Sequence, residues 1–339
     1  MTVRAVVSCA GARQLAVVTL PEARVEQRIA VPAGGEAPAG SIPLAVSPDG
    51  RRLYAADRSE RFSVSSYAIA RESGHLAHLG TAPLPDSMCY LATDASGRWL
   101  FAASYPGSLV SLSRIDADGV VRAAPVQVVP TPPRAHCILP DPANGFVYAA
   151  CLGGDVVLCW KLGADGLDTR SLRTTAVRPG AGPRHLVFGD QGRRVYLLNE
   201  LDATLDVFAC DPANGALAHR QTLAIPGLGA GRAAAADLHL HPSGRFLYAS
   251  ERTTHRLAVF AVDPSQGTLA LIETVDSEQT PRGCAITPDG STLLCAGLTS
   301  DDLGFYAIDA NTGRLMRGAR VATPAGPNWI EIITLTPPG

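Results

Sequence analysis

The chain has 339 residues, of which 46% are hydrophobic and 18% charged, a balance typical of a globular protein with a large buried core. Its formal net charge of −2 gives no electrostatic basis for binding nucleic acid or an anionic membrane surface. The N-terminal text lacks a signal peptide's long apolar run, and no apolar stretch approaches the roughly 18 residues of a membrane span, so we expect a cytoplasmic protein.

The first β-rich segment, residues 4–32, predicts three strands, which correspond to the second, third and fourth strands of the later repeats. Six similar segments follow, and each has an apolar end, a turn with a glycine and a second β-rich run. They are VSPDGRRLYAAD (46–57), ATDASGRWLFAAS (92–104), LPDPANGFVYAAC (139–151), FGDQGRRVYLLNE (188–200), LHPSGRFLYASE (240–251) and ITPDGSTLLCAG (286–297). Their glycines stand at 50, 97, 145, 192, 244 and 290, so the repeat is 46 to 52 residues long. The last text, GPNWIEIITL (326–335), predicts a single strand.

A period of this length in β-rich text is typical of a β-propeller, and each repeat holds four strand candidates. Six complete repeats leave three strands at the beginning of the chain and one at its end. Joined, these four make a seventh blade and leave no open sheet edge. The sequence therefore predicts an all-β, seven-bladed propeller of four-stranded blades, formed by residues 1–339 as a single domain and closed by the N-terminal strands pairing with the C-terminal strand.

The eight cysteines form no CxxC pair, and most stand in apolar strand-like text. We expect free buried thiols rather than disulfides.

Charged residues gather where the innermost strands begin and where the second strands end, and in a propeller these points share one face around the central channel. Eight residues before each turn glycine, or nine in the third repeat because its turn is longer, stand Ile42, Cys89, His136, Arg184, Ala236 and Arg282. Eight residues after it stand Arg58, Tyr105, Gly153, Glu200, Arg252 and Leu298. The closing blade adds Asn328, beside Trp329.

Three more polar residues belong to the same innermost strands. His185 follows Arg184, so strand alternation predicts that it points to the opposite side. Asp237 and His239 alternate inward and are expected to line the channel, either as site residues or as satisfied polar groups in a wet tunnel. We take these three, together with Arg58, Tyr105, Arg252 and Asn328, as candidate substrate-binding residues. The alternative is that polar residues stand at strand ends because they meet water there.

The residue types at this mouth suit general acid–base chemistry on a small anion. The chain has no GxSxG elbow, phosphate-binding P-loop, dinucleotide fingerprint or HExxH motif, and LHLHP is weak as a metal pair. His136 or Glu200 could activate water, while Arg184 and Arg282 could hold an anion and a developing oxyanion. Opening of a lactone by water fits this set and needs neither a metal nor another cofactor.

The segments AHCILPD, GAGPRHLVF, LNELDATLDVF, AADLHLHPSGRFLYASERT and QTPRGCAITPDG resemble the seven-bladed lactonase family, over nearly the whole chain. That family includes the cycloisomerase-like 6-phosphogluconolactonases of carbohydrate metabolism and is related to carboxymuconate-lactonising enzymes. The resemblance implies a metal-free site formed by His136, Arg184, Glu200 and Arg282. One departure is Gly153, where the phosphogluconolactonase-like members often carry a basic residue.

The first substrate expected is 6-phosphoglucono-1,5-lactone. An aldonate or aldarate lactone, or a muconate for a cycloisomerase, would also satisfy the arginines. A non-enzymatic interaction propeller is the alternative of a different class, but it would be expected to show apolar patches rather than converging Arg, His and Glu. The sequence leaves the oligomeric state open.

Overall fold

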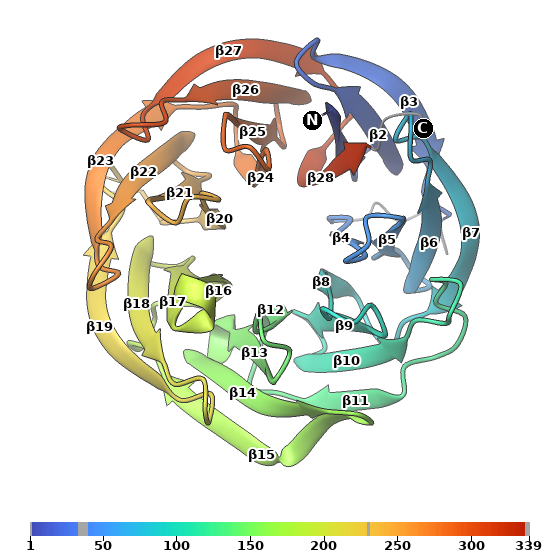
Figure 1. Cartoon of the computed structure of the whole chain (residues 1–339), viewed down its shortest axis with the longest axis horizontal. Coiled ribbons are helices and arrows are strands. Elements are labelled where there is room, and N and C mark those ends of the chain that lie inside the picture. Colours follow the sequence, from blue (N-terminus) through green and yellow to red (C-terminus); the bar gives the residue numbers. More distant parts are fainter. Residues whose placement is uncertain (1, 33–39, 229–230, 336–339) are drawn as a thin grey trace.

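The computed structural model describes residues 2–32, 40–228 and 231–335, and they form a ring of seven four-stranded antiparallel sheets (Figure 1). The first strand of each blade lies nearest the ring centre and the last strand lies at the perimeter. The predicted all-β, seven-bladed architecture is confirmed. The helical elements of the described residues are the short 3₁₀ turns η1 (Leu152–Gly154) and η2 (Asp190–Gly192), and no described helix could cross a membrane.

The blades follow one another in chain order. The first four complete blades are β4 (Leu44–Val46), β5 (Arg52–Asp57), β6 (Ser63–Ile69) and β7 (Leu76–Pro83); β8 (Met88–Thr93), β9 (Trp99–Ser104), β10 (Leu109–Arg114) and β11 (Gln127–Pro130); β12 (Ala135–Pro140), β13 (Phe146–Cys151), β14 (Val156–Gly163) and β15 (Gly166–Ala176); and β16 (Pro183–Gly189), β17 (Arg194–Asn199), β18 (Thr204–Cys210) and β19 (Leu217–Ala224). The fifth and sixth are β20 (Ala235–Leu240), β21 (Phe246–Glu251), β22 (Arg256–Val262) and β23 (Leu269–Asp276); and β24 (Pro281–Ile286), β25 (Thr292–Gly297), β26 (Asp302–Ile308) and β27 (Leu315–Ala322).

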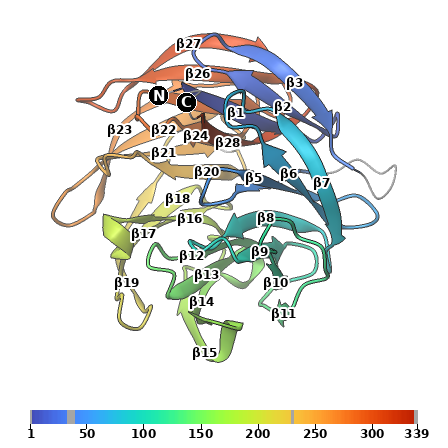
Figure 2. The same cartoon turned by 45° about the vertical axis from the view of Figure 1, so that its right-hand side comes forward.

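The seventh blade joins the two ends of the chain. It consists of β28 (Pro327–Leu335), β1 (Thr2–Cys9), β2 (Gln14–Thr19) and β3 (Arg24–Ala30), in that order from the centre outward. β1 and β28 run antiparallel from the Thr2–Leu335 pair to the Ser8–Trp329 pair, and the two strands lie side by side in Figure 2. The predicted split closure is therefore confirmed, and pairing the ends leaves neither as an open edge.

The core lies between neighbouring blades, because strand alternation gives each sheet two apolar faces. In β5, Leu53 and Ala55 are buried against the seventh blade, whereas Tyr54 and Ala56 are buried against the second blade. The phenol of Tyr54 also donates a 3.0 Å hydrogen bond to the carbonyl of Gly119 in the next blade, and Tyr148 and Tyr248 repeat this contact with later blades. The eight cysteines are buried and free.

Six blades have a β-bulge near the first residues of their innermost strand. Between β16 and β17, Pro183 pairs with Asn199 and His185 pairs with Leu198, which leaves Arg184 as the extra residue. The same shift leaves one extra residue in the second, third, fifth, sixth and seventh blades: Cys89, His136, Ala236, Arg282 and Asn328. These are the positions that the repeat spacing selected in those blades, and a bulge re-aims its side chain relative to regular alternation.

Candidate functional site

Three of the four residues predicted as catalytic meet at the ring centre. His136, Arg184 and Arg282 border a cavity of about 10 Å³ that Ser41, Cys89 and Asn328 also line. This volume is near the lower limit for one water molecule. The bulges bring these side chains from the third, fourth and sixth blades to a single point.

Glu200 lies beside this point and holds two arginines. Its Oε2 accepts a 2.8 Å hydrogen bond from Arg184 Nε, and its Oε1 lies 2.9 Å from Arg252 Nη2. Burial favours the neutral acid, but the two guanidinium groups outweigh it and lower the pKa of Glu200. The carboxylate is thus a weak proton acceptor, and it fixes the positions of both arginines.

Arg282 differs from these arginines because it has no anionic partner. Its guanidinium donates no hydrogen bond and forms no ion pair to any residue in the described part of the chain. Burial, together with the charges of Arg184, Arg252 and Arg58, lowers the pKa of Arg282 to about 9. A cation held this way is favourable only when an anion joins it, so Arg282 marks an anion-binding position.

His136 supplies an imidazole in the neutral form. Its side chain is buried, and Nδ1 has no hydrogen-bond partner among the described residues. Burial, with Arg184 and His185 nearby, places the pKa of His136 well below its usual value. A buried nitrogen without a partner is uncommon in proteins, and the residue that carries it, His136, borders the small central cavity.

His185 lies with Arg184 and not on the opposite side of the strand, so the expectation from simple alternation was wrong. Arg184 Nη1 lies 3.0 Å from His185 Nε2, and His185 Nδ1 lies 2.9 Å from Asp237 Oδ1. The physical reason is the bulge at Arg184, which removes the two-residue period at that point. Burial and the charge of Arg184 lower the pKa of His185 to about 4, so it stays neutral.

Asp237 ties three blades together beneath the mouth. Its carboxylate accepts hydrogen bonds from the backbone N–H groups of Leu238 and Cys284, at 3.0 and 2.8 Å, besides the contact with His185. His239 Nε2 lies 3.0 Å from Oδ2 of Asp237. Burial opposes ionisation of Asp237, but His239 and these hydrogen bonds lower its pKa. With its oxygens so engaged, Asp237 orients His185, and it also lines the small central cavity.

A second cavity, of about 350 Å³, follows the channel below these residues. Asp237, His239, Glu331, Tyr90 and Trp329 are part of its lining. Repeat spacing did not select Tyr90 or Glu331 as lining residues, although Tyr90 stands directly after the selected position Cys89. Burial raises the pKa of Glu331 to about 7, while Trp329 Nε1 donates it a 3.0 Å hydrogen bond.

The remaining candidates divide into two groups. Arg58 donates to the hydroxyls of Ser87 and Ser41, and the ring of Tyr105 packs edge-on against His136 at 6.0 Å, so both belong to the mouth. Asn328 is buried, and its amide bonds to the backbone of Ile42, Gly326 and Ser8. Asn328 therefore joins the seventh blade to the first, and its polar atoms are already occupied.

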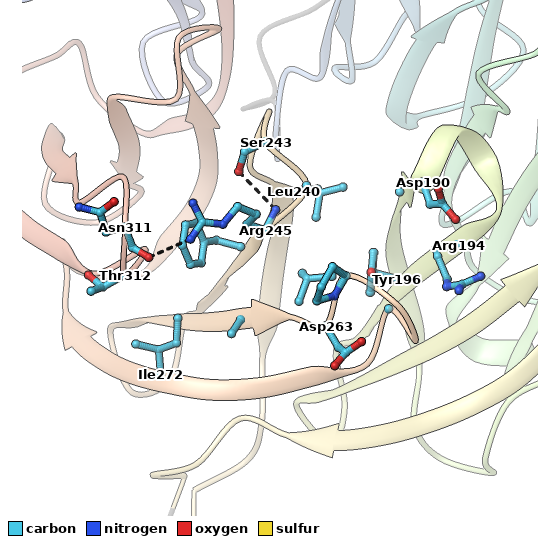
Figure 3. A pocket seen from close by; sticks show the side chains of 17 residues that line it. Asp190, Arg194, Tyr196, Leu240, Ser243, Arg245, Asp263, Ile272, Asn311 and Thr312 are labelled. Atoms are coloured by element: carbon cyan, nitrogen blue, oxygen red, sulfur yellow. Dashed lines mark hydrogen bonds between the residues drawn. The ribbon is translucent and has the colours of Figure 1, made fainter.

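A groove of about 720 Å³ lies on the opposite face, where the strand turns of the fourth, fifth and sixth blades meet (Figure 3). Arg245 there donates to the carbonyls of Ala310 and Asn311, and Arg194 donates to those of Ser265 and Gln266. The two arginines of this groove, Arg194 and Arg245, thus join neighbouring blades.

No group of three or more His, Cys, Asp or Glu side chains in the described ranges could hold a metal ion.

Comparison with known proteins places the chain in one family. Residues 7–332 match the family described as "Lactonase, 7-bladed beta-propeller". The chain belongs to the seven-bladed β-propeller lactonases. The lactonase shares 40% identity over 302 residues with the 6-phosphogluconolactonase of Pectobacterium atrosepticum, covering 88% of this chain and 90% of that one. The 6-phosphogluconolactonase of Serratia proteamaculans is 38% identical over 300 residues, with the same coverage.

A solved structure extends the likeness to a protein named for another substrate. The periplasmic gluconolactonase of Pseudomonas aeruginosa superposes on this lactonase with a TM-score of 0.88 and 26% identity, over 99% of this chain and all of that one. The relatives' names thus include a phosphorylated and an unphosphorylated lactone.

Proposed function

We propose that this lactonase hydrolyses 6-phosphoglucono-1,5-lactone to 6-phosphogluconate. The observation that carries the proposal is Arg282, a partly buried guanidinium without an anionic partner among the described residues, held close to a neutral His136. A lactone that opens through an oxyanion to a carboxylate supplies the negative charge that this arrangement lacks. The names of the 38–40% identical relatives support the substrate, and we place the activity in the cytoplasm, because charged phosphate esters do not readily cross an apolar bilayer.

His136 is proposed as the general base, in preference to Glu200. Both oxygens of Glu200 are held by arginines, whereas Nδ1 of His136 has no partner among the residues that the structure describes. In the first step water attacks the lactone carbonyl carbon, its proton passes to His136, and the carbonyl oxygen becomes an oxyanion beside Arg282. When the oxyanion collapses, the bond from the carbonyl carbon to the ring oxygen breaks, and His136 returns the proton to that oxygen. The products are a carboxylic acid and a free hydroxyl, and the acid then loses its proton to solvent to give the carboxylate.

Arg184 completes the cationic side of the site. Glu200 holds its Nε and His185 meets its Nη1, so the guanidinium is fixed before substrate arrives. Such preorganisation stabilises developing charge without reorganisation during the reaction. Binding of an anion also offsets the positive charges that depress the pKa of His136, which makes it a stronger base in the complex.

The substrate is tested by a panel of purified lactones. We expect a higher kcat/KM for 6-phosphoglucono-1,5-lactone than for glucono-1,5-lactone or a glucaric acid lactone, after spontaneous hydrolysis is subtracted. Acid release at constant pH is the measurement. Absence of turnover on the phosphorylated lactone would overturn the proposal, and preference for a dicarboxylic lactone would identify an aldarate lactonase.

The pH dependence of kcat/KM tests the base. This parameter reports the free enzyme, in which the pKa of His136 lies well below its usual value of about 6.5. The base form is the neutral imidazole, so activity should hold constant as pH falls from 8 through about 6.5 and decline only in more acidic solution. Glucono-1,5-lactone is the comparison substrate, because it lacks a phosphate that titrates near pH 6. A midpoint at or above about 6.5 on both substrates would contradict this assignment.

A further inference from the structure

We propose that Arg134 is the residue that binds the distal phosphate of the substrate and so sets the preference for a phosphorylated lactone. The inference rests on the proposed function and adds to it a binding residue that the repeat spacing did not select. Arg134 directly precedes β12, two residues before His136, and it is exposed on the face of the mouth.

Arg134 is held at the mouth by its aromatic neighbour. Its guanidinium carbon lies 5.5 Å from the centre of the Tyr105 ring, and that ring lies 6.0 Å from His136. The ring of Tyr105 thus contacts both the guanidinium of Arg134 and the imidazole of His136, which keeps these two groups near each other. Arg134 is exposed, whereas Arg282 lines the small central cavity, so Arg134 is suited to a second anion at the far end of the same substrate.

The guanidinium of Arg134 is available to a ligand. It donates no hydrogen bond and forms no ion pair to any residue that the structure describes, while its contact with Tyr105 leaves the donors at the edge of the planar group. A planar guanidinium with free donors matches a phosphate in a two-point contact, which a lysine cannot reproduce.

The backbone that carries Arg134 has a left-handed φ. Arg134 has a φ of +62°. The equivalent positions of the fourth and seventh blades are glycines with a φ of +71°, Gly182 and Gly326, and that of the sixth blade is Thr280, with a φ of +55°. A side chain at such a φ costs free energy that glycine avoids. The chain nevertheless keeps an arginine here, next to two prolines that restrict the segment.

Gly153 makes room for this side chain. A Cβ atom on Gly153 would lie 2.9 Å from Cδ of Arg134 and 3.1 Å from its Cγ, and a Cβ on Gly154 would lie 2.6 Å from Pro132. The stem of Arg134 thus occupies the space that a side chain at 153 would need. The absence of a basic side chain at 153 is accompanied by a cation that reaches the same part of the mouth from position 134.

The test compares two substrates in matched variants. Arg134→Gln should lower the ratio of kcat/KM for 6-phosphoglucono-1,5-lactone to that for glucono-1,5-lactone by about 10- to 100-fold, the loss expected for a charged hydrogen bond. Arg134→Gly should lower the ratio equally while keeping or raising the melting temperature, because glycine suits this φ. Arg170→Gln is the control, since that side chain is 95% exposed on the outer strand β15, and it should leave the ratio unchanged.

The outcomes separate this inference from the proposed function. If the native enzyme hydrolyses the phosphorylated lactone and folded Arg134→Gln and Arg134→Gly both keep the native ratio, Arg134 does not bind the phosphate, and the proposed function stands. If the native enzyme prefers a glucaric acid lactone and Arg134→Gln weakens only that activity, the residue binds a carboxylate and the phosphate assignment is overturned. If the native enzyme hydrolyses no phosphorylated lactone, both proposals fail.

Discussion

Replacing His136 with asparagine should lower kcat on the best substrate by about 10²- to 10⁴-fold, the usual loss for a general base. The variant keeps a polar side chain beside the central cavity but removes the group that takes the proton from water. KM should change much less, because the arginines that bind the anion remain. Steady-state rates, corrected for spontaneous hydrolysis, give both constants.

His75→Gln is the matched control. His75 is an exposed histidine in the outer turn between β6 and β7, far along the sheet from the inner strand, and its replacement should leave kcat unchanged. A His136→Asn protein with the native melting temperature and nearly native kcat would show that the base lies elsewhere, with Glu200 the next residue to replace.

Arg282→Met should lower kcat/KM by about 10²- to 10³-fold and at the same time raise the melting temperature. The loss of activity follows because the guanidinium stabilises charge that develops in the transition state. The gain in stability follows because Arg282 is partly buried among other cations without an anionic partner in the described residues, so its removal relieves repulsion in the free enzyme. We expect a gain of about 1 kcal/mol or more in the free energy of unfolding.

Glu200→Gln should have the opposite effect on the free energy of unfolding. Glu200 bonds Arg184 and Arg252, and its side chain is only 20% exposed, so losing its charge leaves two crowded arginines without this carboxylate. We expect a loss of about 2 kcal/mol or more in the free energy of unfolding, allowing for solvent screening at a partly exposed group. Denaturant unfolding of both variants measures the contrast. If Arg282→Met destabilises the protein as Glu200→Gln does, Arg282 serves the fold and the anion-site assignment is wrong.

The architecture could be predicted from the sequence because its signals are periodic and local. The turn glycines recur every 46 to 52 residues, and strand alternation is readable within each repeat. The closing blade followed from the same signal, since three strands before Val31 and one after Gly326 complete the count. Spacing from the turn glycines also selected His136, Arg184 and Arg282 together, because in a propeller equivalent positions of different blades share one face.

Only the tertiary structure decided how each of these side chains is used. The bulge at Arg184 depends on the register between β16 and β17, which cannot be read from the sequence of either strand alone. This bulge places His185 beside Arg184. Pairing likewise depends on distances between blades: Glu200 bonds Arg184 and Arg252 but not Arg282, although all four stand at comparable sequence positions.

The reach of a long side chain is also a property of the folded ring. Arg134 lies two residues away from the selected position, and its role becomes visible only when its stem packs on Gly153 and its head stacks on Tyr105. Both neighbours are distant from it in sequence. Repeat spacing thus determined which residues gather at the mouth, whereas contacts between blades decided which charges are neutralised and which remain free to bind substrate, because Coulomb energy and desolvation depend on three-dimensional distance and burial.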